Sequence, residues 1–246
     1  MDKIIDLHNQ LEDLDLDLII ASKQKKAPIT EKYFDEKYKR IKLNPLYEFQ
    51  ETENLIDVLN KRKSGRDYDS KQKLDFQEFS SIIYYSYGIK KYRSNAYNRE
   101  YYPVSYSQSA GGLNPFNIYI YIKSVNNIPE GLYYYSPQEN SLILIYEGAV
   151  ALELNENYTT EFPIYASFNI FICTDINRFT WKYGFRGYRM VNIDCGVLAQ
   201  NISLLSTFFS LESCIIAAFS NTKVIKNLDI PKNELPLIGI SIGASL

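Results

Sequence analysis

The sequence predicts an α+β protein in which helices cover an antiparallel or mixed sheet. The order of the predicted helices and strands indicates this fold class. Apolar stretches with helical spacing precede a series of strand-like segments, and one long apolar helix comes before the last two strands. The 246 residues suit one large domain, or one domain with a small appendage. A hydrophobic content of 46% is ample for a packed core.

Composition and charge argue against several classes of function. The formal net charge is −2, so we expect no general attraction to nucleic acid or to an anionic membrane. The three cysteines lie far apart, which argues against a disulfide framework and against a zinc knuckle. With His8 as the single histidine, we expect neither a histidine-based metal site nor a Ser–His catalytic pair. Chemistry in this chain would therefore depend on an organic cofactor.

Residues 1–50 are predicted to be an N-terminal extension of a domain that covers residues 51–246. The apolar residues between 4 and 11 suit a helix, whereas those from 14 to 20 alternate as in a strand, and both interpretations stay open. Residues 22–42 are rich in Lys and Tyr and are expected to be a polar connection with short helical pieces. The chain shows no apolar run of membrane-spanning length and no basic-then-apolar signal, so we expect a cytoplasmic protein.

The domain begins with a predicted helix that runs into a basic cluster. Thr52 is the expected N-cap, residues 55–59 give the helix one apolar side, and Gly65 is the expected stop. Two interpretations of residues 61–66 (Lys-Arg-Lys-Ser-Gly-Arg) stay open. Positive charge complements the dipole at a helix C-terminus. The same Arg, Lys and Ser side chains would also form a clamp for a phosphate or a ribityl chain.

A second helix is predicted from its caps. Asp75 to Glu78 has the form of a capping box, apolar residues continue at helical spacing to Tyr87, and Gly88 closes the helix. Residues 89–106 show no periodicity and are expected to be a polar loop.

Small residues and two glycines then stand directly before a strand. Ser109-Ala110-Gly111-Gly112 leads into residues 116–122, whose alternating apolar residues predict a strand with one buried face. One interpretation of the glycines is a tight turn into a core strand. In the other, they let a flat or anionic ligand approach bare backbone N–H groups.

The rest of the chain supplies the middle and end of the sheet. Residues 132–135 and 142–146 flank turn residues and predict a β-hairpin. An aromatic and basic stretch at residues 178–189 precedes a largely buried helix. The expected segments are strand 167–174, helix 194–211, strand 214–219 and strand 235–242.

Taken in order, five of these motifs resemble the nitroreductase superfamily of FMN enzymes. They are Arg62-Lys63-Ser64-Gly65-Arg66, Ser109-Ala110-Gly111-Gly112, Gly131-Leu132-Tyr133-Tyr134-Tyr135-Ser136-Pro137, Tyr188-Arg189 before the long helix, and the late strand that contains glycine. Within the superfamily the chain is most similar to the azoline dehydrogenases that make thiazole/oxazole-modified microcins and streptolysin-type peptides. The resemblance covers residues 58–243.

The resemblance implies a nitroreductase-like fold, with a central, mostly antiparallel sheet flanked by helices, and a homodimer that holds FMN in its interface. By position, the residues that would bind FMN are Arg62, Lys63, Ser64, Arg66, Ser109, Ala110, Gly111, Gly112, Ala217 and Ala218. The first four would contact its phosphate, ribityl chain and pyrimidine edge, the next four would line the flavin, and the alanines would place amides near its reactive nitrogen. Many members grip the phosphate with a basic tail that has no counterpart after Gly243 here. Phosphate binding would then rely on the first cluster, helped by Arg189, and FMN would be held less tightly.

In the microcin-type enzymes an adjacent Lys-Tyr pair serves catalysis, and the counterpart by position is Lys182-Tyr183. Because Lys-Tyr recurs elsewhere in this tyrosine-rich chain, a solvated loop pair is the other interpretation. The implied reaction oxidises a thiazoline or oxazoline ring in a ribosomally made peptide to the thiazole or oxazole. A base removes the α-carbon proton while hydride passes from the neighbouring carbon to the flavin. For Lys182 to be that base, we expect burial beside Trp181 and Phe185, or the charge of Arg186, to lower its pKa.

The resemblance also implies partners and leaves other functions open. The implied partners are a cyclodehydratase that forms the ring and a precursor peptide that carries a leader, and residues 1–50 would contact one of them. A different function with the same fold is NAD(P)H-dependent reduction of nitro compounds or quinones. A third, from another class, is a non-catalytic scaffold subunit of a peptide-modifying complex.

Overall fold

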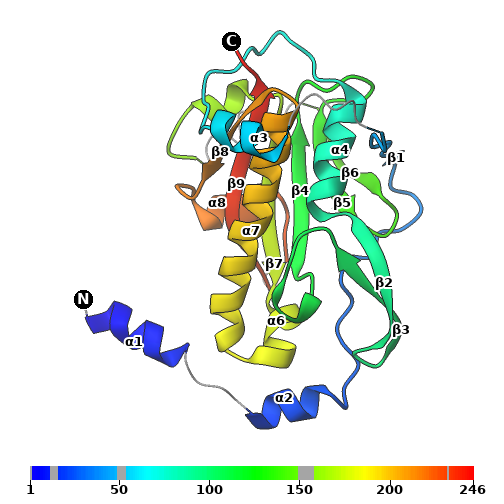
Figure 1. Cartoon of the computed structure of the whole chain (residues 1–246), viewed down its shortest axis with the longest axis vertical. Helices are drawn as coiled ribbons and strands as arrows, with labels where there is room; N and C mark the ends of the chain where they lie inside the picture. The colour runs from blue at the N-terminus through cyan, green and yellow to red at the C-terminus, as the bar shows by residue number, and fades with distance from the viewer. Residues whose placement is uncertain (1, 12–15, 49–53, 149–157, 232) are drawn as a thin grey trace.

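The protein is built on an antiparallel sheet with a separate two-stranded ribbon, which confirms the predicted α+β class (Figure 1). The computed structural model describes residues 2–11, 16–48, 54–148, 158–231 and 233–246. Within these ranges the large sheet has seven strands in the order β1-β6-β5-β4-β7-β9-β8, and each neighbouring pair is antiparallel. The strands are β1 (Arg40–Lys42), β4 (Phe116–Ile122), β5 (Gly131–Ser136), β6 (Ser141–Glu147), β7 (Phe168–Asp175), β8 (Leu211–Ile216) and β9 (Glu234–Ala244).

The middle strand β4 is buried on both faces. Ile118 and Ile120 pack into one core, beneath the helices of one side, whereas Tyr119 and Tyr121 pack into a second core on the opposite face. The prediction that this strand has one buried face is therefore wrong. Tyrosine rings fill the second core because their hydroxyls find buried partners there; the Tyr119 hydroxyl, for example, donates to Glu234 Oε2 at 3.0 Å.

Helices α4 (Phe76–Tyr87) and α7 (Arg186–Phe208) pack against each other on one side of the sheet (Figure 1). Asp75 caps α4 as predicted, because its Oδ1 accepts the backbone N–H groups of Gln77 at 2.7 Å and Glu78 at 3.1 Å. The long helix was predicted over 194–211, but it begins eight residues earlier and ends three residues earlier. Its first turn carries the half-buried Arg186 and Arg189 and the exposed Tyr188, which hide the apolar period in the sequence.

Helix α3 (Leu55–Lys61) is shorter than predicted. The expected cap, Thr52, lies outside the described residues, and Asn54 caps the helix by accepting two backbone N–H groups of its first turn. The helix ends before Gly65, so the prediction that this glycine stops it is wrong.

The polar stretch 89–106 is not a loop but a hairpin, β2 (Ile89–Ala96) and β3 (Arg99–Ser105). Both residues of its turn have positive φ, 54° at Tyr97 and 56° at Asn98, as the I′ turns of hairpins require. The loop prediction fails because most side chains of β2 are exposed, so the strand shows no alternation of apolar and polar residues.

The remaining elements agree with the sequence in part. The hairpin β5–β6, strand β7 and strand β9 are confirmed, whereas the strand expected over 214–219 is β8, displaced towards the N-terminus. The aromatic and basic stretch at 178–189 forms the end of helix α6 (Ile176–Tyr183) and the beginning of α7. A further helix, α8 (Asn221–Asn227), has no counterpart in the prediction.

The N-terminal extension begins with helices α1 (Asp2–Gln10) and α2 (Leu16–Ser22), so the strand interpretation of residues 14–20 is wrong over its described part, 16–20. In Figure 1, α1 extends away from the body of the molecule, whereas α2 packs against α6. Residues 23–39 contain turns but no helix, which contradicts the predicted helical pieces. Their backbone is held by tertiary hydrogen bonds instead, such as Ala27 N to Tyr97 O at 3.1 Å. Among the described helices, none has the length and apolar character needed to cross a membrane.

Candidate active site

The glycine-containing turn before β4 is a short 3₁₀ turn, Ala110–Gly112, whose glycines have left-handed backbones. The φ angle is 62° at Gly111 and 69° at Gly112, a region that other residues enter only at a cost. The turn is closed by Gly112 N, which donates to Ser109 O at 2.8 Å, and by Asn114 N, which donates to Ser109 Oγ at 3.1 Å.

Three polar side-chain atoms converge on Gly111. A Cβ atom added there would lie 2.6 Å from the Tyr183 hydroxyl, 2.9 Å from Lys182 Nζ and 3.0 Å from the Tyr97 hydroxyl. The structure therefore brings the predicted catalytic pair to the predicted turn, and it adds a third residue, Tyr97, that the sequence interpretation missed. The sequence carries one signal for the turn that presents it, since Asn98 follows Tyr97 directly and asparagine tolerates positive φ.

The amine of Lys182 is surrounded by tyrosines. Its Nζ donates to the Tyr97 hydroxyl at 3.0 Å, and it lies 4.8 Å from the ring centre of Tyr97 and 5.0 Å from that of Tyr183. Partial burial lowers the pKa of Lys182, but its hydrogen bonds and electrostatic interactions with Tyr97 and Tyr183 together raise it above its ordinary value. The expectation of a lowered pKa is wrong, because one of these hydroxyls comes from the β2–β3 hairpin, which the sequence pattern does not predict.

Helix α7 holds the turn from the other side. Asp194 Oδ2 accepts the backbone N–H of Ala110 at 2.8 Å. Burial raises the pKa of this carboxyl, although the Ala110 hydrogen bond opposes the effect. Asp194 is not among the predicted site residues, because no pattern in the sequence indicates that its helix passes the turn.

The basic cluster at residues 62–66 packs against β8. Lys63 Nζ forms an ion pair with Glu212 Oε1 at 2.8 Å, and Ser64 forms a parallel bridge with Ser213. A Cβ on Gly65 would lie 1.2 Å from Glu212 Oε2, so this glycine leaves room for the carboxylate. Hydrogen bonding to Glu212 raises the pKa of Lys63.

A cavity of about 260 Å³ opens beside this cluster. It is lined by cationic and hydroxyl side chains together with one carboxylate and one leucine: Lys61, Lys63, Thr207, Ser210, Leu211, Glu212 and Ser245. Arg66 lies outside this lining, with its guanidinium carbon 5.7 Å from the ring centre of Phe162.

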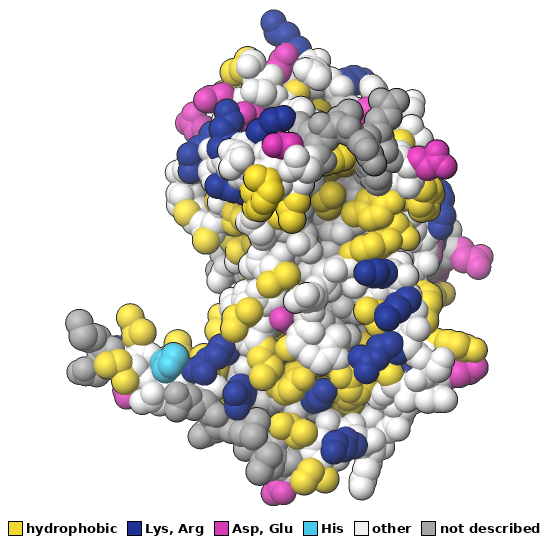
Figure 2. All heavy atoms as spheres, viewed as in Figure 1, with side chains coloured by type: hydrophobic (Ala, Val, Ile, Leu, Met, Phe, Trp, Pro, Cys, Tyr) yellow, Lys and Arg dark blue, Asp and Glu magenta, His cyan; other side chains and the backbone are white. Residues whose placement is uncertain are grey.

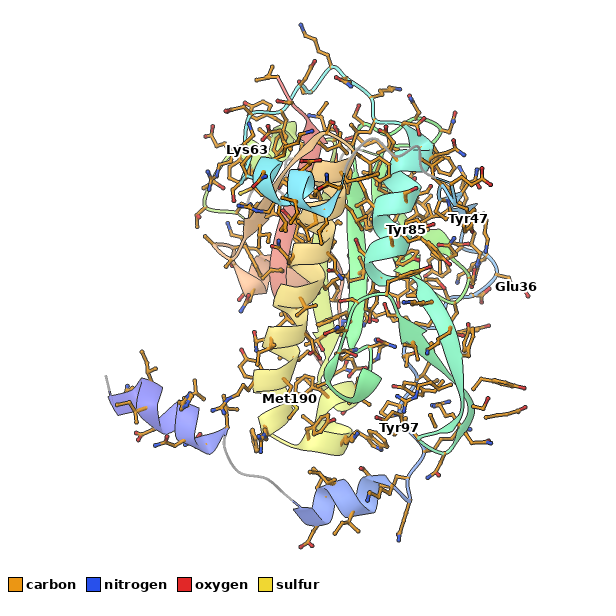
Figure 3. All side chains as sticks on the ribbon, viewed as in Figure 1. Glu36, Tyr47, Lys63, Tyr85, Tyr97 and Met190 are labelled. Carbon is orange, nitrogen blue, oxygen red and sulfur yellow. The ribbon has the colours of Figure 1, made fainter. Side chains whose placement is uncertain are left out.

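The two groups of predicted cofactor residues lie towards opposite ends of α7. The turn is bonded to Asp194, whereas the cavity is lined by Thr207, and 13 helical residues separate these positions by about 20 Å. Figure 3 shows the same separation, with Lys63 near one end of the molecule and Tyr97 and Met190 near the other. One chain therefore does not bring all the predicted cofactor residues together.

The other predicted cofactor residues, Arg189, Ala217 and Ala218, also lie in two separate parts of the structure. Arg189 lies on the first turns of α7, where its Nη2 donates to His8 O at 2.7 Å, and it does not approach the basic cluster of its own chain. Ala217 and Ala218 are exposed just beyond the end of β8, and Ala218 O accepts Thr159 N at 3.3 Å.

The residues present fit a cofactor that carries a phosphate and a flat ring. Lysine and hydroxyl side chains around the cavity suit an anion, although Lys63 already forms an ion pair with Glu212. At Gly112 the nearest atom to a missing Cβ is Arg93 Nη1 at 3.5 Å, so this side of the turn leaves backbone open to a ligand. Figure 2 shows further Lys and Arg side chains over α6, the beginning of α7 and the β2–β3 hairpin.

Comparison with known proteins agrees with this architecture. Residues 59–244 match the model of the nitroreductase family. A curated protein of Methanocaldococcus jannaschii, named a candidate nitroreductase, is 31% identical over 193 residues, which are 78% of this chain and 91% of that protein.

Solved structures show the same fold at lower identity. A candidate nitroreductase from Anabaena variabilis superposes with a TM-score of 0.71 at 24% identity; the match covers 85% of this chain but 42% of that one. A chain of the Escherichia coli microcin synthetase McbBCD, solved with truncated pro-MccB17 bound, gives a TM-score of 0.64 at 20% identity over 82% of this chain and 77% of that one. The family match covers more than half of this chain, and the match to the curated relative covers most of that protein's length. The chain therefore belongs to the nitroreductase family.

Proposed function

We propose that this protein is an FMN-dependent azoline dehydrogenase, which oxidises thiazoline or oxazoline rings in a ribosomally made precursor peptide to thiazole or oxazole. The observation that carries the proposal is the convergence of Lys182 and Tyr183 on the turn at Gly111. Family membership supports an oxidoreductase. The likeness to a chain of a microcin synthetase complex with a bound pro-peptide supports the choice of substrate class.

The chain's own residues would do the proton chemistry. FMN, when bound, supplies the acceptor for the hydride that leaves the ring carbon. Lys182, in its neutral form, would take the proton from the former α-carbon, and Tyr183 would relay that proton or hold the ring. Because the pKa of Lys182 is raised, only a small fraction of the amine is neutral at pH 7, so turnover would increase with pH.

We propose further that two copies of the chain complete each site. Residues 62–66, with Ala217 and Ala218, would hold FMN from one copy, and the turn at Ser109–Gly112 would line it from the other. The separation of these groups along α7 supports this arrangement. Exposed apolar side chains on α3, whose last residue Lys61 lines the cavity, support it as well: Leu55 and Ile56 are 64% and 62% exposed.

Mixed dimers test the shared site. Lys182→Ala and Arg62→Ala chains would each be inactive alone. After subunit exchange, half of the dimers are mixed and hold one intact site, so the mixture would recover about one quarter of the wild-type turnover. Mixed dimers that form but show no activity would overturn the two-copy arrangement.

The substrate class implies further partners and a place in the cell. A cyclodehydratase would form the ring first, and a leader-bearing precursor peptide would present it. Residues 1–50 would contact one of these; α1 offers Ile4, Ile5 and Leu7, each at least half exposed. We place this chemistry in the cytoplasm, where such peptides are made.

A second candidate is an NAD(P)H-dependent reductase of nitro compounds or quinones. The name of the 31% identical relative favours it. It requires the same cofactor but a nicotinamide as the hydride donor, and it does not require Lys182 as a base.

The purified protein tests the proposal directly. We expect a yellow protein that releases one FMN per chain on heating. With a leader peptide that carries a preformed azoline, mass spectrometry should show the loss of two hydrogens per ring. A protein that binds FMN but leaves the azoline peptide unchanged, with or without its cyclodehydratase, would refute the dehydrogenase. A protein that takes up no FMN would favour a scaffold subunit.

A further inference from the structure

We propose that Tyr97 is a positioning residue that fixes the amine of Lys182 over the turn at Gly111. Its hydroxyl bridges the two groups: it donates to Gly111 O and accepts from Lys182 Nζ at 3.0 Å. The kinetic consequence rests on the proposed role of Lys182 as a base, whereas the placement of the amine does not.

The hydrogen-bonding capacity of a phenol explains the arrangement. Tyr97 has one O–H to donate, and the carbonyl of Gly111 takes it. The oxygen can then only accept from Lys182, so the lysine must direct one N–H towards Tyr97. In the neutral amine this leaves the lone pair directed away from Tyr97.

The ring of Tyr97 is held by its neighbours. It stands edge-on to Trp181, with ring centres 5.6 Å apart and planes at 90°, and edge-on to Tyr102 at 5.1 Å. These contacts involve the ring and not the hydroxyl. Replacing Tyr97 by Phe would therefore remove the bridge and keep the packing.

The turn that carries Tyr97 is tied to the N-terminal extension. Tyr97 O accepts Ala27 N at 3.1 Å, Asn98 Nδ2 donates to Lys23 O at 3.0 Å, and Arg99 Nε donates to Ala27 O at 2.9 Å. The side chain of Tyr97 thus links residues 23–27 to the amine of Lys182. Through this link the N-terminal extension reaches the site without contacting the substrate.

Several charged or polar groups face the Lys182 amine or the turn beneath it. Tyr97 comes from the hairpin and Tyr183 from α6 itself. Arg93 of β2 lies by Gly112, and Asp194 of α7 binds Ala110. Among these, Tyr97 makes the bridging contact, so its hydroxyl is the group to remove.

The test uses two conservative variants on one hairpin. Tyr97→Phe removes the bridging hydroxyl, and Tyr101→Phe removes a hydroxyl from a side chain that is 62% exposed. Lysines are labelled by reductive ¹³C-methylation, the Lys182 signal is assigned with Lys182→Arg, and its titration is followed by NMR in the FMN-loaded protein. Flavin content, kcat, KM and the pH profile are measured on the unlabelled proteins.

We expect Tyr97→Phe to lower the midpoint of the Lys182 titration by roughly half to one pH unit, because a hydrogen bond to the charged amine is lost. We also expect the turnover per neutral amine, obtained from kcat and the Lys182 midpoint, to fall about tenfold, with KM and flavin content unchanged, because the freed amine no longer meets the substrate in one geometry. The larger neutral fraction of the amine offsets part of this fall in kcat at neutral pH. Tyr101→Phe should match the wild type in both measurements.

The titration separates this inference from the proposed function, since it needs no substrate. A shifted midpoint in a protein that does not oxidise azolines would uphold the positioning role and refute the dehydrogenase. An unchanged midpoint in Tyr97→Phe would overturn the positioning role, whatever happens to kcat. So would an equal shift in Tyr101→Phe.

Discussion

The three polar side chains that surround Gly111 give the sharpest prediction for the site, the substitution Gly111→Ala. The new methyl group would lie 2.6 Å from the Tyr183 hydroxyl, 2.9 Å from Lys182 Nζ and 3.0 Å from the Tyr97 hydroxyl. All three atoms are the ends of long side chains, so they can move by an ångström or so at little cost. The left-handed backbone, with φ at 62°, cannot be relieved in the same way.

The expected loss of stability is therefore modest and the expected loss of activity is large. A left-handed backbone costs an alanine roughly 1–2 kcal/mol, which would lower the melting temperature of a chain of this size by about 2–8 °C. Displacing the amine and both hydroxyls would reduce turnover about 100-fold, the scale reported for a 1 Å misplacement of catalytic groups.

Gly148→Ala is the matched control. Its φ is 102°, and no atom lies within 4 Å of the position of its missing Cβ. It should lose stability on the same scale and keep its turnover. Thermal unfolding and azoline oxidation are measured on both variants. If Gly111→Ala retained turnover within about twofold of Gly148→Ala, the convergence on Gly111 would not be needed for chemistry.

Three further predictions follow from other contacts. Lys182→Ala should keep FMN, seen in the visible spectrum, and lose turnover; full activity would refute the lysine as base. Turnover should rise about tenfold per pH unit between pH 7 and 9, because only the neutral amine accepts a proton and its raised pKa lies above this range; a flat pH–rate profile would contradict this. Glu234→Gln should lower the free energy of unfolding by about 1–3 kcal/mol, since it leaves Lys32, 2.7 Å away, without its carboxylate partner. Glu139→Gln, which breaks the more exposed pair with Arg40, should cost less than about 1 kcal/mol in the same denaturant titration; equal losses would show that burial does not decide the strength of these pairs.

The elements that the sequence predicted well are those whose apolar pattern reflects burial. Strand 116–122 and hairpin β5–β6 were predicted at nearly their observed bounds, because their side chains fill two cores. The β2–β3 hairpin was missed because exposed polar residues make up most of β2. A strand such as β2, exposed on both faces, leaves no period to detect, although Asn98 at the turn was a local signal.

The candidate site was predictable in its parts but not in its electrostatics. The order of motifs singled out both Gly111 and Lys182, and the structure places them in contact range. The direction of the Lys182 pKa was wrong because it depends on Tyr97, a residue 85 positions away in the chain. Similarly, the basic cluster was visible in the sequence, but its ion pair with Glu212 arises only when residues 62–66 pack on β8.

The most direct test of the proposed dehydrogenase is reduction of the bound flavin without oxygen. A stopped-flow instrument monitors this reduction through the visible absorbance of the flavin. The azoline-bearing peptide should bleach the flavin within a single turnover, NADH and NADPH should not, and Lys182→Ala should bind the peptide without bleaching. Rapid bleaching by NADH or NADPH, with none by the peptide, would contradict the dehydrogenase and favour the nitro or quinone reductase.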